Sequence, residues 1–133
     1  MKRFTTILLI AALVAIGAAF TCSNQAAKVS LGVAASAKAF QDGEIALHNQ
    51  GKIGDGEHVL IQQSLIQLAT AGKAVNQCIG ATGAASCVDP AIKAIDSIQQ
   101  SAISPIKNKE SQQQLTILLG SVRASFIALQ GAL

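Results

Sequence analysis

Apolar residues recur along most of this 133-residue chain at alternating spacings of four and three, which is the period of one face of an α-helix. Four stretches after residue 22 carry such a face. In the first, from about residue 25 to 49, it consists of Val33, Ala37, Phe40, Glu44 and Leu47. In the second, from about 55 to 79, it consists of Ile61, Leu65, Leu68, Gly72, Val75 and Ile79. The pattern therefore predicts helices, and signals for β-strands are sparse.

The third and fourth stretches follow in the same manner. The third starts near residue 89, and its face consists of Ala91, Ile95, Ile98 and Ala102. The fourth reaches the end of the chain, and its face consists of Leu115, Leu119, Val122, Phe126, Leu129 and Leu133. Four such faces in about 110 residues can bury one another in one core, although amphipathic helices can also pair between chains.

Residues with known capping preferences separate these stretches. Gly51 can take the left-handed conformation that ends a helix, and Asp55 is a plausible N-cap for the next one. Asp89 is expected to cap the third helix, because Pro90 then occupies the first helical position, where a missing N–H costs nothing. Pro105 is expected either to interrupt the third helix or to start the next one.

Short connections between helices of similar length favour antiparallel neighbours. We therefore expect an all-α fold, an up-and-down antiparallel bundle of about four helices over residues 23–133. An N-terminal signal or anchor helix over residues 1–22 is expected to precede it.

The first 22 residues have the layout of a secretory signal. Lys2 and Arg3 form a basic start, the apolar segment from Phe4 to Phe20 follows, and polar residues come next. Positive charge stays on the cytoplasmic side during insertion, and about 17 apolar residues is the lower limit for spanning a bilayer. We expect removal of the segment, with retention as a membrane anchor as the alternative. The predicted location is outside the cytoplasm, in the periplasm or anchored in the cell envelope.

The sequence Ala19-Phe20-Thr21-Cys22 resembles the lipobox of bacterial lipoproteins, in which the cysteine becomes the lipidated first residue. Thr21 and Ala19 depart from the residues usual in that motif. The resemblance makes Cys22 a lipidation candidate, while cleavage by an ordinary signal peptidase remains an alternative.

Assigning Cys22 to the signal leaves an even number of cysteines, Cys78 and Cys87. The eight residues between them include two glycines and several other small residues, so the segment can close easily. In an oxidising compartment we expect a disulfide bond between these two cysteines. The alternative is a pair of buried thiols.

Ionisable side chains gather at the predicted turn between the first two helices. Glu44 and His48 are four apart and share a face, and folding the chain about Gly51 brings Glu44 opposite His58. Together with Glu57 they could hold a divalent metal, since carboxylate and imidazole suit zinc or a non-haem metal. The Glu44–His58 pair could instead titrate and make the turn pH-sensitive, or simply hydrogen-bond at a solvated end of the bundle.

Composition and missing motifs exclude several classes of function. The formal charge is only +3 and charged residues make up 13%, which is too little for an electrostatic nucleic-acid binder. The sequence carries no nucleophile elbow, phosphate loop, dinucleotide fingerprint or haem attachment motif. We therefore expect neither an enzyme nor a cofactor. Eight of the thirteen glutamines, among them Gln62, Gln63, Gln67 and Gln112, are expected mainly on outer helix faces.

These patterns predict an exported small helical bundle, membrane-tethered if Cys22 is lipidated, with a binding or structural role in the cell envelope. An envelope protein is the expected kind of partner. One alternative is a small-ligand or metal carrier that uses Glu44, His48, Glu57 and His58. A second is a small membrane-anchored phage or envelope protein.

Overall fold

The computed structural model describes residues 24–82 and 85–133. The expected signal or anchor helix, with the lipidation candidate Cys22, lies outside these residues. The described helices are α2 (Asn24–Asn49), α3 (Asp55–Thr82), α4 (Asp89–Ile98) and α5 (Lys109–Ala132). A short 3-10 helix, Ala85–Val88, precedes α4, and a π-helical turn, Gln99–Ile103, continues it.

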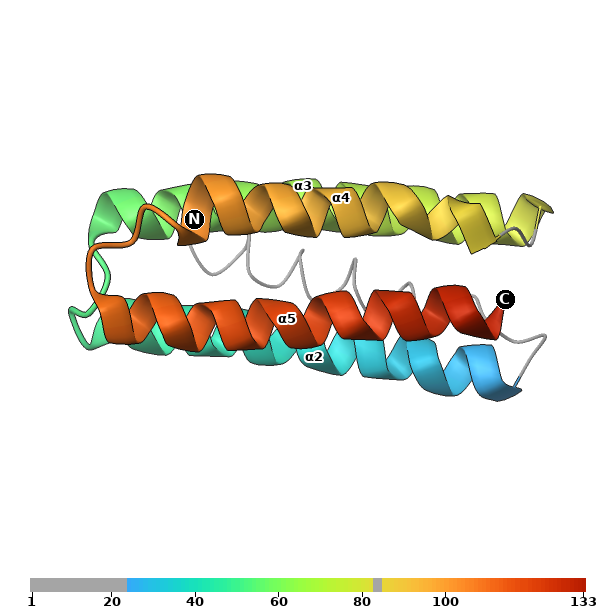
Figure 1. The fold of residues 1–133 in the computed structure, drawn as a ribbon, viewed down its shortest axis with the longest axis horizontal. Coiled ribbons are helices and arrows are strands. Elements are labelled where there is room, and N and C mark those ends of the chain that lie inside the picture. The colour runs from blue at the N-terminus through green and yellow to red at the C-terminus, as the bar shows by residue number, and fades with distance from the viewer. Residues whose placement is uncertain (1–23, 83–84) are drawn as a thin grey trace.

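The four helices are arranged in two layers (Figure 1). One layer holds α3 and α4, and the other holds α2 and α5, with successive helices running in opposite directions. The described residues contain no strand, so the prediction of an all-α fold is confirmed.

The core consists of the faces that the apolar period predicts. Val33, Phe40, Ile61 and Leu68 are buried from α2 and α3, and Phe126 is buried from α5. The expectation is wrong for Leu133, which is 38% exposed because α5 has already ended at Ala132.

The packing of α2 against α5 runs along the length of that layer. Ser36 donates a hydrogen bond from its hydroxyl to that of Ser125, at 3.1 Å, so these two residues lie at the same level. About two turns further along α2, a Cβ placed on Gly43 would lie 2.6 Å from Cδ1 of Leu118. The missing side chain at Gly43 therefore allows α5 to come close.

The turn between α2 and α3 is closed by the conformation of one glycine. Gly51 has a φ of 71°, the left-handed region predicted for it. Its N–H donates to the carbonyl of His48 at 3.0 Å, and the N–H of Lys52 donates to that of Leu47 at 2.9 Å. These two bonds form a Schellman motif, which satisfies the last carbonyls of α2.

The structure corrects the predicted N-cap of α4. Asp89 is not the N-cap, because Val88 occupies that position in a helical conformation without a side-chain cap. The preceding 3-10 turn already runs into the helix, so the first N–H groups need no carboxylate there. The carboxylate of Asp89 instead accepts a hydrogen bond from Nε2 of Gln130 on α5, at 2.7 Å.

α5 begins with a side-chain cap. Asn108 is in an extended conformation, and its side-chain oxygen accepts from the N–H of Ser111 at 2.9 Å. Further along α5, Arg123 forms an ion pair with Asp96 of α4 at 2.8 Å. The hydrogen bond and negative charge of Asp96 raise the pKa of the Arg123 guanidinium above its usual value.

The close approach at Gly43 yields a prediction. Gly43→Leu should lower the free energy of unfolding by about 1–3 kcal/mol, because the larger side chain overlaps Leu118. Urea unfolding followed by circular dichroism measures this. Gly56→Leu is the matched control, since a Cβ at Gly56 meets nothing within 4 Å. Equal losses in both variants would contradict a specific role of Gly43 in the α2–α5 contact.

Candidate functional site at the turn between α2 and α3

A fully buried carboxylate lies where α2 approaches the start of α3. Glu44 occupies a position on the buried face of α2 and is 0% exposed. One of its oxygens is hydrogen-bonded to Nδ1 of His58, and the other accepts from Nε2 of Gln62 at 2.7 Å. His58 and Gln62 are four residues apart on α3, so the same side of that helix supplies both partners.

A second imidazole extends this network toward solvent. The ring of His48 stacks on that of His58, with centroids 4.0 Å apart and planes 8° from parallel. Nε2 of His48 also lies 2.8 Å from a carboxylate oxygen of Asp55, the first residue of α3. We call the linked side chains of Gln62, Glu44, His58, His48 and Asp55 the turn network.

The turn network contains three of the four residues considered as metal ligands. Glu57 lies elsewhere, because its carboxylate accepts from the N–H of Gly54 at 2.9 Å and from that of Lys107 at 3.0 Å. It thereby caps the start of α3 and joins it to the segment before α5. Within residues 24–82 and 85–133, no group of three or more His, Cys, Asp or Glu side chains could hold a metal ion. The geometry therefore gives the metal interpretation no support.

Two amide side chains behave differently from what composition suggests. Gln62 was expected mainly with the surface glutamines, yet it donates to the buried carboxylate of Glu44. Gln41, one turn before Glu44 on α2, is 1% exposed, and neither of its amide atoms has a hydrogen-bond partner in the described part of the chain. A buried amide without partners costs about 1–3 kcal/mol. Helical spacing was the signal in the sequence for both glutamines, because Gln41 lies three residues before Glu44 and Gln62 lies four residues after His58.

The chemistry of the turn network is that of an anchor between two helices. A buried carboxylate is costly unless its lone pairs are used, and here both oxygens have partners on α3. In the described residues, neither imidazole is hydrogen-bonded to a hydroxyl or thiol that could serve as a nucleophile. The arrangement therefore holds α2 to α3.

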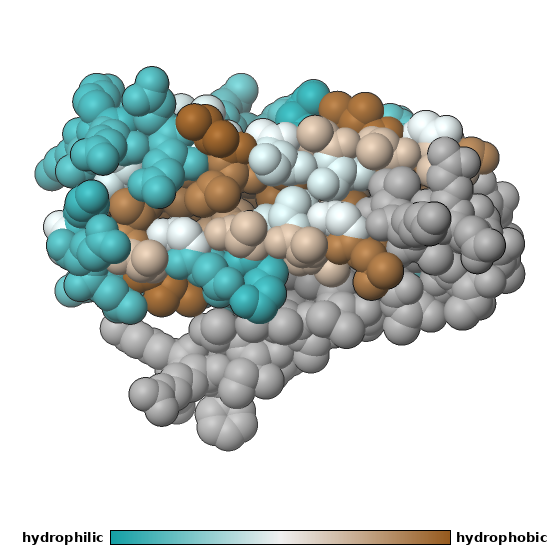
Figure 2. All heavy atoms as spheres, turned by 90° about the horizontal axis from the view of Figure 1, so that it is seen from below, coloured by the Kyte–Doolittle hydropathy of each residue, from teal (hydrophilic) through white to brown (hydrophobic). Residues whose placement is uncertain are grey.

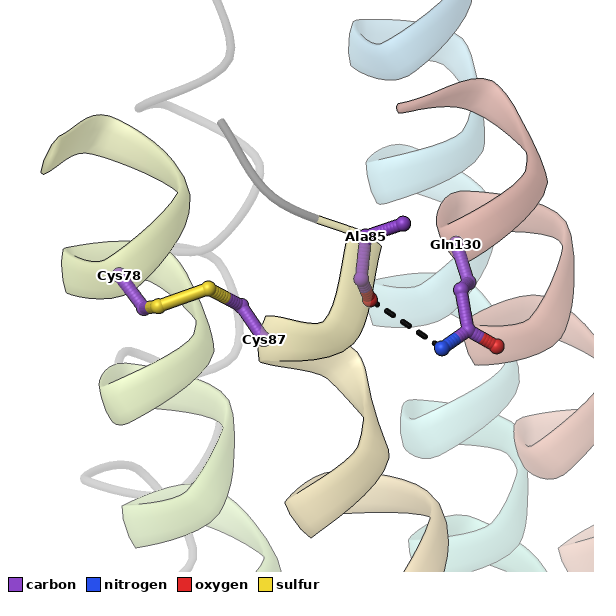
Figure 3. The surroundings of a disulfide bond; sticks show 4 residues. All are labelled: Cys78, Ala85, Cys87 and Gln130. Carbon is purple, nitrogen blue, oxygen red and sulfur yellow. Dashed lines mark hydrogen bonds between the residues drawn. A yellow bond between two sulfur atoms is a disulfide. The ribbon is translucent and has the colours of Figure 1, made fainter. Parts of the chain in front are cut away.

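The opposite end of the bundle is held covalently. Cys78 of α3 and Cys87 of the 3-10 helix form a disulfide bond with their Cα atoms 5.9 Å apart (Figure 3). Beside it, Nε2 of Gln130 on α5 donates to the carbonyl of Ala85 at 3.1 Å. Three elements are therefore joined at this end, α3 and α5 both through the short 3-10 helix.

Together, the fold and these two ends define a disulfide-linked four-helix bundle with a buried carboxylate–histidine network. Comparisons of the chain with protein-family models, with curated proteins and with solved structures find no match. The functional argument therefore depends on the chain itself.

The burial of Glu44 yields a prediction that a double-mutant cycle can measure. Combining Glu44→Ala with His58→Ala should reveal a coupling energy of about 1–3 kcal/mol, because removing either partner leaves the other group buried. The matched control is Lys38→Ala with Asp42→Ala, an exposed pair on the same helix with a 2.7 Å contact. Its coupling should stay below about 0.5 kcal/mol. Equal couplings in urea unfolding would mean that the buried pair has no special role.

The disulfide yields a second prediction. The double variant Cys78→Ser, Cys87→Ser should lose about 2.5–3 kcal/mol of unfolding free energy, because the bond restricts the unfolded chain. The melting temperature should fall by several degrees under oxidising conditions. Adding dithiothreitol should lower the melting temperature of the unsubstituted chain to that of the variant. If the unsubstituted chain is still more stable than the variant after full reduction, loss of the disulfide bond is not the cause of the variant's lower stability.

Proposed function

We propose that this chain is an exported, non-enzymatic helical-bundle protein with a binding or structural role in the cell envelope. The observation that carries the proposal is the disulfide between Cys78 and Cys87, because such bonds persist in oxidising compartments and are rare in the cytosol. It agrees with the signal-like pattern of the first 22 residues, which is an independent feature of the sequence.

A structural or binding role is favoured over catalysis by the state of the ionisable groups. The buried carboxylate of Glu44 is fully engaged in joining two helices, and Glu57 is engaged in backbone capping. The groups that could have formed a reactive centre thus serve the fold. Attachment to the membrane, through lipid on Cys22 or through retention of the apolar segment, belongs to the same proposal.

The proposal predicts the location and redox state of the full chain in a Gram-negative host. After acid quenching, Cys78 and Cys87 should resist a maleimide reagent until they are reduced, and the protein should fractionate with the periplasm or membranes. Leu9→Asp, which places a charge in the apolar segment, should retain the chain in the cytoplasm with reactive thiols. An unsubstituted chain that stays in the cytoplasm with free thiols would refute export.

The mass of the exported chain distinguishes the modes of attachment. A lipidated N-terminus at Cys22 should be lost in Cys22→Ser, whereas ordinary cleavage or retention should be unaffected by that change. An intact Met1 in the membrane fraction would identify an anchor.

A further inference from the structure

The sides of α2 and α3 that face each other carry small and uncharged residues beyond the turn network. Steps of seven residues, about two helical turns, lead back from His48 along α2 and forward from Gln62 along α3. Because the turn network joins these two residues, the positions reached in this way lie on facing sides. We call them the α2–α3 seam, which consists of Ala34, Gln41, Ala69 and Asn76.

The seam is enclosed although α2 and α3 belong to different layers (Figure 1). Most close backbone contacts of α2 are with α5, and most of those of α3 are with α4 and the short helices that flank it. Even so, Gln41 and Ala69 are only 1% and 7% exposed. Burial of the seam therefore does not come from a close approach of its two helices.

Two polar groups in the seam lack partners within residues 24–82 and 85–133. Both amide atoms of Gln41 and Oδ1 of Asn76 are buried without a hydrogen bond to these residues. Buried polar groups in native proteins are nearly always hydrogen-bonded, so each exception calls for a partner or an explanation. The amide of Gln41 thus points to a group that lies over the seam.

The position of Gln41 along the bundle narrows the source of that group within this chain. Gln62 bonds to Glu44, one turn from Gln41, so Gln62 and Gln41 lie at nearly the same level. From Gln62, α3 continues for about 30 Å before residues 83–84 begin, and two residues cannot bridge that distance. Residues 1–23 are the part of the chain that remains.

Residues 1–23 lead directly into α2, and their length brings them back to Gln41. The helix expected there contains the apolar residues 4–20, which extend about 25 Å at the rise of an α-helix. From its first residue, Asn24, to Gln41, α2 rises by the same distance. Reversal of the chain within residues 21–23, a usual length for the connection between antiparallel helices, puts Thr5 level with Gln41.

The side chains of the segment fit the seam at this register. Steps of seven from Thr5 lead to Ala12 and Ala19, so these three share one side of the expected helix. Ala12 then comes level with Ala34, and small residues on both sides let two helices approach closely. At the level of Gln41, the hydroxyl of Thr5 can both donate to and accept from the amide.

Charged side chains border the seam and do not belong to it. Lys38 and Lys73 are exposed, and Lys38 is paired with Asp42 on the outer side of α2. A lysine stem can cover apolar surface while its ammonium group stays in water. The outer side of the α2–α5 layer, by contrast, mixes hydrophilic with apolar surface (Figure 2). The seam is therefore the more uniformly uncharged surface for an apolar helix.

We propose that residues 4–20, in the chain that retains them, pack along the α2–α3 seam as a further helix of the bundle. Burial of their apolar side chains drives the contact, and the hydroxyl of Thr5 is hydrogen-bonded to the amide of Gln41. Cleavage of the segment would remove this cover and expose the seam. The inference concerns the uncleaved chain and does not depend on export.

Disulfide trapping in the full chain tests the proposal. Thr5→Cys and Gln41→Cys are combined in a Cys22→Ser background, and the chain is made by cell-free synthesis without membranes, so that the apolar segment is retained. Mild oxidation of the monomer should join the two introduced thiols. After digestion with trypsin, mass spectrometry should find residues 4–28 linked to residues 39–52.

Thr5→Cys with Asp42→Cys is the matched control. Position 42 is next to position 41 on α2, but it is exposed on the outer side of the helix. The same two tryptic peptides carry its thiols, so the two yields can be compared directly. The control should give at most about a tenth of the linked product.

A charge within the seam provides the second arm. Ala34→Glu should lower the yield of the trapped product about tenfold or more, because the carboxylate would be buried under the segment without a partner. Ala35→Glu, at the next and exposed position of α2, should leave the yield unchanged. Cooperative thermal unfolding, followed by circular dichroism, checks that both variants are folded.

The hydrogen bond has a test of its own in urea unfolding of the full chain. Thr5→Val should raise the equilibrium constant for unfolding about fivefold, because the amide of Gln41 loses its partner. In a Gln41→Leu background the same change should have less than about a twofold effect. Thr6→Val, which alters the neighbouring hydroxyl on another side of the expected helix, is the control and should also stay below about twofold.

The contrary outcomes are equally specific. Equal trapping at positions 41 and 42, products that join only two separate chains, or a yield that ignores Ala34→Glu in a folded variant would overturn the packing along the seam. An effect of Thr5→Val that is the same with and without Gln41→Leu would overturn the hydrogen bond.

Discussion

The packing of α2 against α5 is the constraint on which the rest of the bundle depends, because it joins the first described helix to the last. The hydroxyls of Ser36 and Ser125 meet across 89 positions of sequence, so a long loop of chain must close before this contact forms. Gly43 makes the approach close enough for Leu118 to fill the space where a side chain would lie. Once α2 and α5 form one layer, their buried faces present a continuous apolar surface on which α3 and α4 can pack.

The charged residue in that surface decides how α2 meets α3. Glu44 lies between Phe40 and Leu47 on the buried face of α2, where an unpartnered carboxylate would be strongly unfavourable. His58 and Gln62 satisfy it only if the first turns of α3 lie opposite the last turns of α2. The left-handed conformation of Gly51 reverses the chain at the required point. A polar group that would destabilise many alternative packings is therefore consistent with this register, which is a form of specificity that apolar contacts alone do not provide.

The sequence predicts those features of this structure that depend on interactions between residues close together in the chain. Helical spacing identified the buried faces, because burial of one side of a helix depends on a local period. It also placed Glu44 opposite His58, since a short turn fixes the register of a hairpin. The predicted cap of α4 was wrong for two reasons. A 3-10 turn leads directly into the helix, and the side chain of Gln130, 41 positions away, hydrogen-bonds the carboxylate of Asp89. Burial of Gln41 could not be predicted either. Glutamine is usually found on surfaces, and it is the tertiary arrangement that encloses Gln41.

The two ends of the bundle are fixed by different means. At one end the turn network and the Schellman motif use hydrogen bonds, while at the other the disulfide holds the short 3-10 helix against α3. In the middle of the α2–α5 layer, the described residues are joined by the Ser36–Ser125 bond, and Gly43 lets the two helices approach closely. The α2–α5 pair therefore depends on close approach at its middle, whereas the ends of the bundle are fixed by directional bonds.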